Sequence, residues 1–501
     1  MHDRASIKTV VIIGGGLGGL FTGALLAKKG IKVTLIEKNS SLGGGLQTFV
    51  RFGEVYDTGM HVVAGMHEGG NIRRLCDYLG VYDESMFVDV NRRCSDSIYI
   101  ASDGMTYRIA VGKEGYLSSI CRYFPEQREN IKRYIDALYA IVDEMPLYHL
   151  RSGSDGEYVH NEDFFMAADD FISKYITDER LKGIVSYLSL LYCGEGHTTP
   201  AYIHAVISVL YFTGPSRFAG GSHRFAELLE KVILDHGGEI ILNDAVKHIH
   251  NEGRKIQSVE TSRGKCLHAD CYISDIHPSP LIELFDEPSA FPKAYRNRIA
   301  EVPNTYSAFT INLKFHANTF MYLNHTGYYF EDYDSVWKMG DVTSRWPLGF
   351  LYMTPPEVNQ GKYSTKMIIT VPMPWEYVKK WEETSLSQRS KDYQFWKKQC
   401  MDIVLDKLEE IYPGLRNCIE AVNTASPLTI RDYYGTKEGA MCGIKKDCKN
   451  INLSQMSVRT KVENLLLTGQ NVSLHGFCGV PLTAIRTCEE ILGRNTILDE
   501  L

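Results

Sequence analysis

The sequence has no long run of apolar residues that is free of both glycine and charge. Thr9 to Ala27 is uncharged, but six glycines interrupt it, whereas a membrane-spanning helix needs about 20 predominantly apolar residues. Met1 to Lys8 leads directly into the first expected strand, so cleavage of a secretory peptide here would destroy the glycine turn that follows. We therefore expect neither a membrane-spanning helix nor a secretory peptide.

Basic charge and paired cysteines are also lacking. The net charge of -7 leaves no basic surface for nucleic acid. The 12 cysteines are scattered, without C-x-x-C pairs or histidines at metal-ligand spacing, so we expect no metal site and no disulfide framework. Reduced thiols are typical of a cytoplasmic protein. At 501 residues the chain exceeds a single hydrophobic core, which predicts two domains.

Glycine, by contrast, is concentrated near the N-terminus. Gly14, Gly16 and Gly19 fill a G-x-G-x-x-G frame directly after the β-branched run Thr9–Ile13. In this frame the first glycine makes a tight turn, the second lets the backbone approach a pyrophosphate, and the third lets the helix pack closely on its strand. The order predicts a strand, a glycine turn and a helix whose free N–H groups face phosphate.

The residues that follow complete a dinucleotide-binding pattern. Gly30 ends the helix, Lys32 to Ile36 is the second strand, and Glu37 closes it where a carboxylate accepts hydrogen bonds from a ribose. The alternative is a glycine-rich helix start that binds nothing. It is disfavoured, because each glycine in an ordered element costs roughly 1 kcal/mol. A second glycine cluster, Gly43 to Gly45, lets another backbone segment lie against the cofactor.

With these motifs the chain resembles the FAD-dependent polyene oxidoreductases, the family of phytoene desaturases, carotenoid isomerases and retinol saturases. The residues that carry the resemblance are the G-x-G-x-x-G frame, Glu37-Lys38, Gly43-Gly44, Thr48-Phe49, Asp57-Thr58-Gly59, His61, Asn464–Gln470 and Gly476–Gly479. Many relatives place an arginine after the glycine pair, to contact the cofactor phosphates. This chain has Gly45 there, which favours the saturase and isomerase branch over the amine-oxidase branch.

The resemblance implies an α/β fold. A Rossmann-type FAD-binding domain, like those of glutathione reductase and amine oxidases, would be joined to a second, α+β substrate domain built on an antiparallel sheet. We expect the FAD-binding domain to be discontinuous and to comprise residues 1–80, 215–290 and 462–501. The substrate domain would comprise residues 81–214 and 291–461.

It also implies a set of cofactor-binding residues. Val246 is expected to meet the adenine through its backbone, the segment ending Ile273-Ser274-Asp275 to lie near the cofactor, and the last helix to point its N-terminus at the flavin. The full set is Gly14, Gly16, Leu17, Gly18, Gly19, Glu37, Lys38, Gly43, Gly44, Gly45, Thr58, Gly59, His61, Val246, Ser274, Gly469, Gln470, Gly479, Val480 and Pro481.

Periodicity predicts the remaining elements. We expect helices over 71–79, 115–143, 163–191, 387–411 and 482–492, a hairpin over 94–108, short strands over 239–242, 245–249, 255–259 and 266–273, and further strands over 349–353, 366–371 and 464–467. Ser222 is expected to cap the helix that follows it. The apolar positions of 309–315 alternate with polar ones, which predicts a half-buried strand. In the helix over 387–411, Trp396, Cys400, Ile403, Val404 and Ile411 should face inward.

Two features of the middle region leave alternatives open. A polar link, Arg151 to Glu157, joins two helical stretches rich in aromatic residues. These aromatic side chains form either the wall of a long apolar tunnel or ordinary helix core. Gly435, Gly439 and Gly443 resemble the family's loop beside flavin and substrate, although glycine loops are common in all proteins.

The function we infer is an FAD-dependent oxidoreductase acting on carbon–carbon double bonds of a long apolar polyene or isoprenoid, with saturation favoured over desaturation or isomerisation. His61, His475 and Tyr433 are the candidates for proton transfer. Each of them also has an ordinary structural role as its alternative. Two other functions stay open: an amine or porphyrinogen oxidase of the same fold, and a prenyl- or lipid-binding escort protein without flavin.

The expected electron donor and binding partners follow from the inferred oxidoreductase function. No second G-x-G-x-x-G follows a strand, so NAD(P)H as electron donor would have to visit the substrate cavity. The partner is an apolar small molecule and not nucleic acid. Because such molecules reside in membranes, we expect a cytoplasmic protein with peripheral membrane contact. The sequence does not indicate an oligomeric state.

Overall fold

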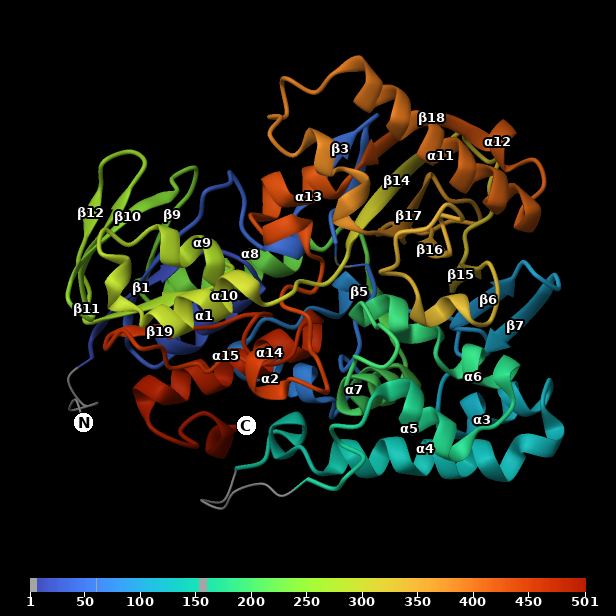
Figure 1. Ribbon diagram of the computed structural model, residues 1–501, viewed down its shortest axis with the longest axis horizontal. Helices are drawn as coiled ribbons and strands as arrows, with labels where there is room; N and C mark the ends of the chain where they lie inside the picture. The colour runs from blue at the N-terminus through green and yellow to red at the C-terminus, as the bar shows by residue number, and fades with distance from the viewer. Residues whose placement is uncertain (1–6, 60, 153–159) are drawn as a thin grey trace.

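The computed structural model describes residues 7–59, 61–152 and 160–501. Two large β-sheets form its framework, one on the left and one at the upper right of Figure 1. Helices cover both sheets, and the strands of each come from distant parts of the chain. Within the described residues, no helix combines the length and the apolar character needed to cross a membrane.

The first sheet is fully parallel, as the β-branched runs predicted. Its order is β19-β13-β1-β2-β9. The strands are β19 (Leu465–Leu467), β13 (Cys271–Ser274), β1 (Thr9–Ile13), β2 (Lys32–Ile36) and β9 (Glu239–Ile241). They come from the beginning, the middle and the end of the chain, so this sheet forms only when all three stretches have met.

The carboxyl ends of these strands gather the polar residues of the site. Gly14 follows β1, Glu37 follows β2, Asp275 follows β13, and Thr468 follows β19. Ile13 pairs with both Ile36 and Ser274 in the parallel register. Since parallel strands all end at one edge, the four residues that follow them lie along that edge.

Each face of the parallel sheet has its own core. Val10 and Ile12 pack toward helices α1 (Leu17–Lys28), α8 (His223–Asp235) and α15 (Gly476–Leu492). Val11 and Ile13 belong to a separate cluster with the three-stranded antiparallel sheet β10 (Val246–Glu252), β11 (Lys255–Thr261) and β12 (Cys266–Leu267). This alternation follows from the two-residue period of a strand, and it buries both faces of β1.

The second sheet has seven strands and is mixed, not purely antiparallel as expected. Its order is β18-β14-β17-β16-β15-β6-β7, and β15 pairs with β6 in parallel. The strands are β18 (Ile419–Ala425), β14 (Ser307–Phe315), β17 (Lys366–Met373), β16 (Gly349–Met353), β15 (Thr326–Phe330), β6 (Asp96–Ile100) and β7 (Met105–Ile109). The expected hairpin over 94–108 is β6–β7, and it joins this sheet through the parallel pair.

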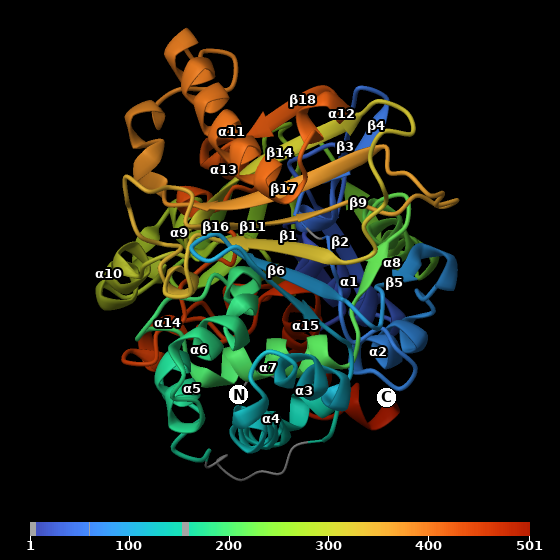
Figure 2. The ribbon, with the colours of Figure 1, turned by 90° about the vertical axis from the view of Figure 1, so that its right-hand side faces the viewer.

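Helices cover both faces of the second sheet (Figure 2). One face carries α11 (Lys391–Ile411), α12 (Leu415–Cys418) and α13 (Pro427–Tyr434). On the other side lie α3 (Lys113–Cys121), α4 (Arg128–Asp143), α5 (Ala168–Tyr175), α6 (Glu179–Val185) and α7 (Ala201–Phe212). Shorter elements complete the fold: α2 (Asn71–Leu79), α9 (Pro278–Glu283), α10 (Lys293–Glu301), α14 (Ile451–Ser454), and the strand pairs β3 (Thr48–Arg51)–β4 (Glu54–Asp57) and β5 (Phe87–Asp89)–β8 (Ser216–Phe218).

Three helix predictions were wrong in extent. The helix expected over 115–143 is broken into α3 and α4 at Pro125, because Phe124 takes an extended φ of −133° before the proline. The helix expected over 163–191 is divided into α5, α6 and a 3-10 segment over Tyr187–Tyr192. The last helix begins at Gly476, six residues before the expected start, and holds Pro481 in its interior.

Two side-chain predictions were also wrong. Ser222 makes no capping bond to its helix. Its hydroxyl instead lies 2.9 Å from the carbonyl oxygen of Leu46 and 2.8 Å from Asp57 Oδ1. In α11, Cys400 and Val404 are buried as expected, but Ile403 is 42% exposed because that side of the helix faces solvent.

The strand β14 is buried on both faces instead of one. Asn312 is only 2% exposed, and Ala308 and Thr310 line an internal cavity. The polar positions that alternate along β14 therefore face a cavity or the protein interior instead of solvent. A sequence pattern does not distinguish these two cases. Of the expected polar link over 151–157, residues 153–157 lie outside the described residues.

Candidate dinucleotide and apolar-ligand site

The glycine turn after β1 has the geometry that its spacing predicted. Gly14 has a φ of +101°, a left-handed conformation that favours glycine. A Cβ on Gly19 would lie 2.1 Å from the carbonyl oxygen of Gly14, so only glycine lets α1 pack this closely on its strand. Gly16 precedes α1 and offers no side-chain cap. The first N–H groups of the helix therefore meet no cap of their own and instead face the carboxyl group of Asp275, at a helix N-terminus that favours an anion.

The second glycine cluster lies directly against this turn. The N–H of Gly43 donates to the carbonyl oxygen of Gly15 over 2.7 Å, and Gly16 and Gly43 form a parallel bridge. A Cβ on Gly44, whose φ is +56°, would lie 3.2 Å from the Cα of Gly16. Two glycine segments thus form one narrow cradle whose surface is backbone without side chains. The sequence predicted that these glycines would allow such a close approach of backbone.

Glu37 is held rigidly at the end of β2. One carboxylate oxygen accepts a hydrogen bond from the N–H of Gly15, and the other accepts one from the N–H of Asn39, both over 2.8 Å. Only 7% of Glu37 is exposed, and the residue lines the cavity described below. Each carboxylate oxygen has a further lone pair, so Glu37 can still accept a ribose hydroxyl.

Asp275, the last residue of the segment expected near the cofactor, lies within the glycine cradle. A Cβ on Gly18 would lie 2.3 Å from Asp275 Oδ1, and one on Gly469 would lie 2.1 Å from the same oxygen. Burial raises the pKa of Asp275 to about 7; amide hydrogen bonds from Gly19 oppose the rise, and the charge of Glu37 adds to it. This carboxyl group lies where a diphosphate would approach the helix.

The C-terminal residues close the cradle from the other side. Gly469, with a φ of +83°, turns the chain after β19. Asn471 accepts a hydrogen bond from the N–H of Ile444 over 3.1 Å, which fixes the loop that carries Cys442. His475 precedes α15 without capping it, and its Nε2 atom is buried without a hydrogen-bond partner. The N-terminus of α15 therefore faces the same cavity as that of α1.

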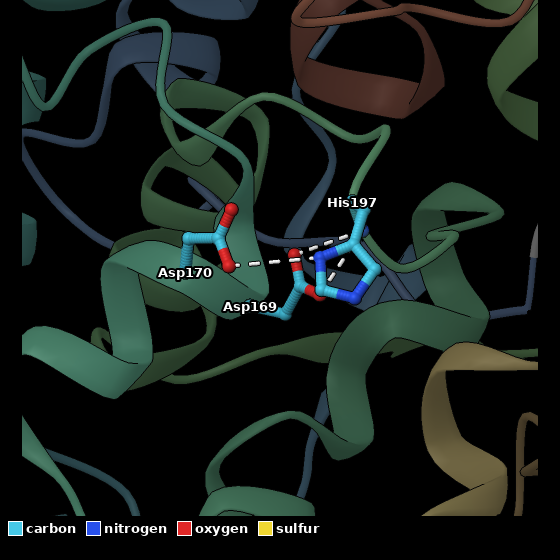
Figure 3. A group of neighbouring side chains, drawn as sticks. All are labelled: Asp169, Asp170 and His197. Carbon is cyan, nitrogen blue, oxygen red and sulfur yellow. Dashed lines mark hydrogen bonds and ion pairs between the residues drawn. The ribbon is translucent and has the colours of Figure 1, made fainter.

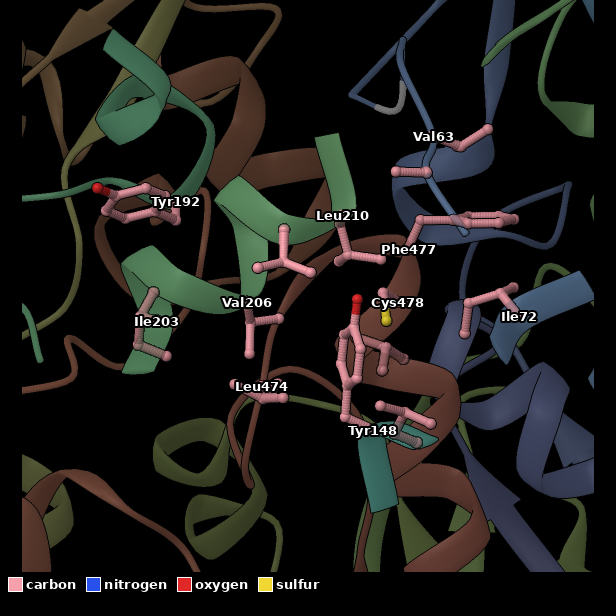
Figure 4. Close-up of a cluster of buried hydrophobic side chains, with 14 of the residues drawn as sticks. Val63, Ile72, Tyr148, Tyr192, Ile203, Val206, Leu210, Leu474, Phe477 and Cys478 are labelled. Carbon is pink, nitrogen blue, oxygen red and sulfur yellow. The ribbon is translucent and has the colours of Figure 1, made fainter. Parts of the chain in front are cut away.

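A single cavity of about 440 Å³ joins the cradle to an apolar chamber. Its polar half is formed by the glycine segments, Glu37, Asp275 and the strand ends. Its apolar half lies between α7, the start of α15 and the second sheet. Figure 4 shows the α7 residues Val206 and Leu210 close to Leu474 and Phe477. The apolar part of the lining includes Val63, Leu190, Leu191, Ile203, Val206, Ile207, Leu210, Leu351, Met353, Leu474 and Phe477.

The aromatic residues of the helical region have mixed locations. Tyr211 lines the cavity, whereas Tyr116, Tyr134 and Tyr187 are buried in the core. Tyr134 and Tyr192 hydrogen-bond to opposite ring nitrogens of His204, over 2.6 and 2.8 Å. Burial lowers the pKa of His204 to about 3, so this imidazole stays neutral inside the helices. Of the two alternatives left open for these aromatic residues, helix core therefore describes most of them, and α7 contributes the chamber wall.

The three predicted proton-transfer residues all line the cavity, but their surroundings differ. His61 Nδ1 is buried and without a hydrogen-bond partner, and burial lowers the pKa of His61. His475 presents its unpartnered Nε2. Tyr433 is 51% exposed. The adjacent Tyr434 points inward instead, since a Cβ on Gly59 would lie 2.6 Å from its hydroxyl oxygen.

Most of the predicted cofactor-binding residues line this cavity. They are Gly14, Gly16, Leu17, Gly18, Glu37, Lys38, Gly43, Gly44, Gly45, Thr58, Gly59, His61, Val246, Gln470, Gly479 and Val480. Gly19, Ser274, Gly469 and Pro481 are not among its lining residues. Ser274 is fully buried, and its neighbour Asp275 reaches the cavity. Sequence reasoning missed Tyr434, Thr436 and Cys442 as lining residues, and of the segment ending at Asp275 it selected Ser274 instead of Asp275.

One further group of potential ligands lies elsewhere on the molecule. Asp169, Asp170 and His197 come together at the start of α5, where His197 Nδ1 is 3.0 Å from Asp169 and 3.6 Å from Asp170 (Figure 3). The His197 side chain is 73% exposed. None of the three residues lines the cavity, and they satisfy one another as a surface ion-pair cluster.

Comparison with known proteins places this site in context. Residues 12–79 match the model of the NAD(P)-binding Rossmann-like domain. All-trans-retinol 13,14-reductase of Danio rerio is 24% identical over 98% of this chain and 86% of its own length. 4,4'-Diapolycopene oxygenase of a Methylomonas species is 22% identical over 95% of this chain and 96% of its own length. Prolycopene isomerase 1 of an Oncidium hybrid is 22% identical over 87% of this chain and 75% of its own length.

Solved structures confirm the fold. An oxidoreductase from Methanosarcina mazei superposes with a TM-score of 0.65 at 17% identity, over 96% of this chain and all of its own. Putrescine oxidase bound to putrescine gives a TM-score of 0.64 at 14% identity, over 97% of this chain and 99% of its own. The chain thus has a Rossmann-like dinucleotide-binding region joined to a mixed sheet, and its full-length homology to the proteins above is distant.

Proposed function

We propose that this chain, a distant full-length homologue of retinol saturase, carotenoid oxygenases and prolycopene isomerase, is an FAD-dependent oxidoreductase acting on carbon–carbon double bonds of a long apolar polyene or isoprenoid. The single cavity carries the proposal, because a dinucleotide cradle and an apolar chamber open into one another. Residues 1–80, 215–290 and 462–501 would form the FAD-binding domain. Residues 81–214 and 291–461 would form the substrate domain.

The residues of the cradle fit FAD in three respects. The paired glycine segments place backbone N–H groups, which now face the Asp275 carboxyl group, at the start of α1, where the diphosphate would lie. Glu37 is fixed to accept the ribose hydroxyls. The N-terminus of α15 would stabilise negative charge on a reduced ring. Asp275 is the one opposing group, and it must be neutral or displaced when a diphosphate enters.

Bound FAD would supply hydride transfer at its ring nitrogen N5, which is chemistry that no side chain provides. The chain's own contribution begins with the apolar lining, which binds a polyene by excluding water and orients it along α7. Unpartnered polar atoms at the cavity wall then define where a proton is held. They include His61 Nδ1, His475 Nε2, Asp244 Oδ2, Thr370 Oγ1 and Thr436 Oγ1.

His61 is the preferred proton carrier among these groups. Its Nδ1 atom is buried, unpartnered and at the cavity wall, and its lowered pKa keeps the imidazole neutral at pH 7. A neutral imidazole accepts a proton at one nitrogen while donating from the other. Tyr433, with its exposed hydroxyl, is the weakest of the three candidates.

Saturation is the favoured direction, with desaturation and isomerisation of the same bonds as the related outcomes. NAD(P)H is the proposed donor, entering the substrate cavity, since the sequence offers no second G-x-G-x-x-G for it. Peripheral contact with a membrane would bring the substrate to the chamber. Retinoids and carotenoids are the first substrates to test, because the names of the homologues specify them.

The test uses the holoprotein reduced with dithionite or NADPH without oxygen, then mixed with a panel of retinoids and carotenoids. Return of the oxidised flavin spectrum with loss of polyene absorbance would support saturation. Reoxidation by oxygen or quinone alone would support a desaturase or oxidase. If no polyene reacts in either direction or isomerises, the proposed substrate class is wrong.

A further inference from the structure

Two cysteine thiols are in contact beside the cavity. Cys193 and Cys442 are 249 residues apart in sequence, and their sulfur atoms lie 3.2 Å apart. A disulfide bond is about 2.05 Å long, so the sulfur atoms need to approach by only about 1.2 Å. Among the residues that the structure describes, none of the other ten cysteines has its sulfur against a second one.

The fold brings these two thiols together from separate elements. Cys193 ends the 3-10 segment Tyr187–Tyr192 with a φ of +53°, a left-handed conformation that is strained for a residue other than glycine. Cys442 lies in the loop after Gly439, where its N–H donates to Thr305 Oγ1 over 3.0 Å. The surrounding hydrogen bonds hold both residues in place.

The two thiols differ in acidity. The S–H of Cys193 donates to the sulfur of Cys442, which lowers the pKa of Cys442, and the nearby His475 lowers it further. Burial raises the pKa of Cys193. Cys442 is therefore the more acidic of the two thiols, as the attacking cysteine is in thiol–disulfide chemistry.

Access to the pair runs through the cavity. Cys442 is 8% exposed and lines the main cavity, whereas Cys193 is 3% exposed and does not line it. Both residues line a smaller adjoining cavity, together with Thr305 and His475. A small reagent that enters the main cavity thus reaches the more acidic thiol first.

We propose that Cys193 and Cys442 are a redox-active pair that a small hydroperoxide converts into a reversible disulfide. The Cys442 thiolate attacks one peroxide oxygen, the O–O bond breaks, and a sulfenic acid forms while hydroxide leaves and takes up a proton as water. The Cys193 sulfur then attacks Cys442 Sγ, losing its proton as a second water leaves. Two thiols are oxidised by two electrons, and hydrogen peroxide is reduced to two waters.

This chemistry goes beyond the proposed function and needs no bound flavin. Its structural consequence is local. The new bond would link the loop that carries Cys442 to the end of the 3-10 segment, beside His475. Oxidation would therefore fix one wall of the cavity in a position drawn toward Cys193.

The test is a peptide map of the full chain after titration with hydrogen peroxide. Remaining thiols are blocked with N-ethylmaleimide, and the protein is unfolded, digested and analysed without reductant. We expect loss of two of the 12 thiols, one cross-linked peptide pair containing Cys193 and Cys442, and full recovery with dithiothreitol. The map of the wild-type chain is decisive even if a cysteine variant fails to fold.

Single variants test the division of roles. In Cys193→Ser, dimedone should trap a sulfenic acid at Cys442. In Cys442→Ser, Cys193 should stay unmodified. Cys488→Ser, a buried position in α15 away from the pair, should cross-link like the wild type. Oxidation confined to the exposed Cys266, or separate oxidation of Cys193 and Cys442 without a cross-link, would overturn the proposal.

Discussion

The hydroxyl of Tyr434 donates a hydrogen bond to the hydroxyl oxygen of Thr58 over 2.9 Å. Thr58 in turn donates to the carbonyl oxygen of Gln47. The bond joins α13, which packs on the second sheet, to the segment after the second glycine cluster. The two residues are 376 positions apart in the sequence. It closes the cradle beside Gly45 and Gly59.

Tyr434→Phe is expected to weaken FAD binding moderately. Removing one hydrogen bond costs about 1 kcal/mol, which is roughly a fivefold rise in Kd. The measurement is a fluorescence titration of apoprotein with FAD. Tyr433→Phe is the matched control, since its side chain is half-exposed and should leave the Kd unchanged. Equal effects of the two variants would contradict the assignment of Tyr434 to the cradle.

Gly18→Ala is expected to remove most dinucleotide binding. Its Cβ would lie 2.3 Å from Asp275 Oδ1 and 2.6 Å from the Cα of Gly469, so the cradle must open to accept it. We expect the Kd for FAD to rise by at least about tenfold, equivalent to about 1.4 kcal/mol. Gly361→Ala serves as control, because it has an ordinary φ and open space around it. Unchanged FAD content in the Gly18 variant would show that the cofactor lies elsewhere.

Asp275 makes FAD binding depend on pH. With its pKa raised to about 7, the carboxyl group is neutral below that pH and repels a diphosphate above it. Affinity for FAD should therefore fall by up to about tenfold per pH unit above pH 7. Asp275→Asn should bind FAD more tightly at pH 8 and lose this dependence. The exposed Asp235→Asn should behave like the wild type, and a steep pH dependence retained in Asp275→Asn would contradict the account.

The stability of the apoprotein should also depend on pH through Asp275, and it should fall as pH rises. A carboxyl group with a raised folded-state pKa stabilises the fold at low pH and loses that contribution as pH rises from about 4 to about 7. The Tm of the wild-type apoprotein should therefore include a decrease over this pH range that comes from Asp275. The Asp275→Asn protein should lack it.

His61→Gln tests proton transfer separately from cofactor binding. A positioned acid–base group contributes about 10²-fold or more to turnover, so a loss of that order in kcat is expected with an unchanged flavin spectrum. His67→Gln is the control, because His67 lies on the same stretch of chain with its side chain exposed. If His61→Gln retains full turnover, the proton comes from another group, with His475 as the next to examine.

Ile207→Trp tests the apolar chamber. Ile207 is half-buried on α7 and lines the cavity, so an indole there would occupy space needed by a polyene. KM for the substrate should rise by about tenfold or more while FAD content stays constant. Leu234→Trp, at an exposed position of α8, should leave both unchanged. An unaltered KM in Ile207→Trp would place substrate binding outside this chamber.

The parts of the fold that could be predicted are those set by local pattern. The run Thr9–Ile13, the glycine turn and Glu37 are close in sequence and chemically specific, so their structure followed directly. The break at Pro125 comes from the proline, whereas α5 ends at an extended Ile176 and α6 starts after Asp178, whose side chain caps it, against the apolar periodicity of 163–191. The mixed pairing of β15 with β6 joins strands over 200 residues apart, which no local pattern indicates.

The same division holds for the site. The segment ending at Asp275 was expected near the cofactor, but that Asp275 and not Ser274 reaches the cradle depends on the register in which β13 pairs with β1. Tyr434 differs from the predicted Tyr433 by one residue, and the direction of α13 decides which of the two points inward. The contact of Cys193 with Cys442 joins two distant loops, and scattered cysteines gave no spacing from which to infer it. The roles of the individual site residues stay predictions.

The absorbance spectrum of the purified protein, before and after incubation with FAD and gel filtration, tests the central claim most directly. The account predicts flavin bands in the visible and near-ultraviolet, one FAD per chain, and bleaching by dithionite. A colourless protein that takes up no FAD after reconstitution would contradict it. The chain would then be an apolar-ligand-binding protein on an oxidoreductase fold.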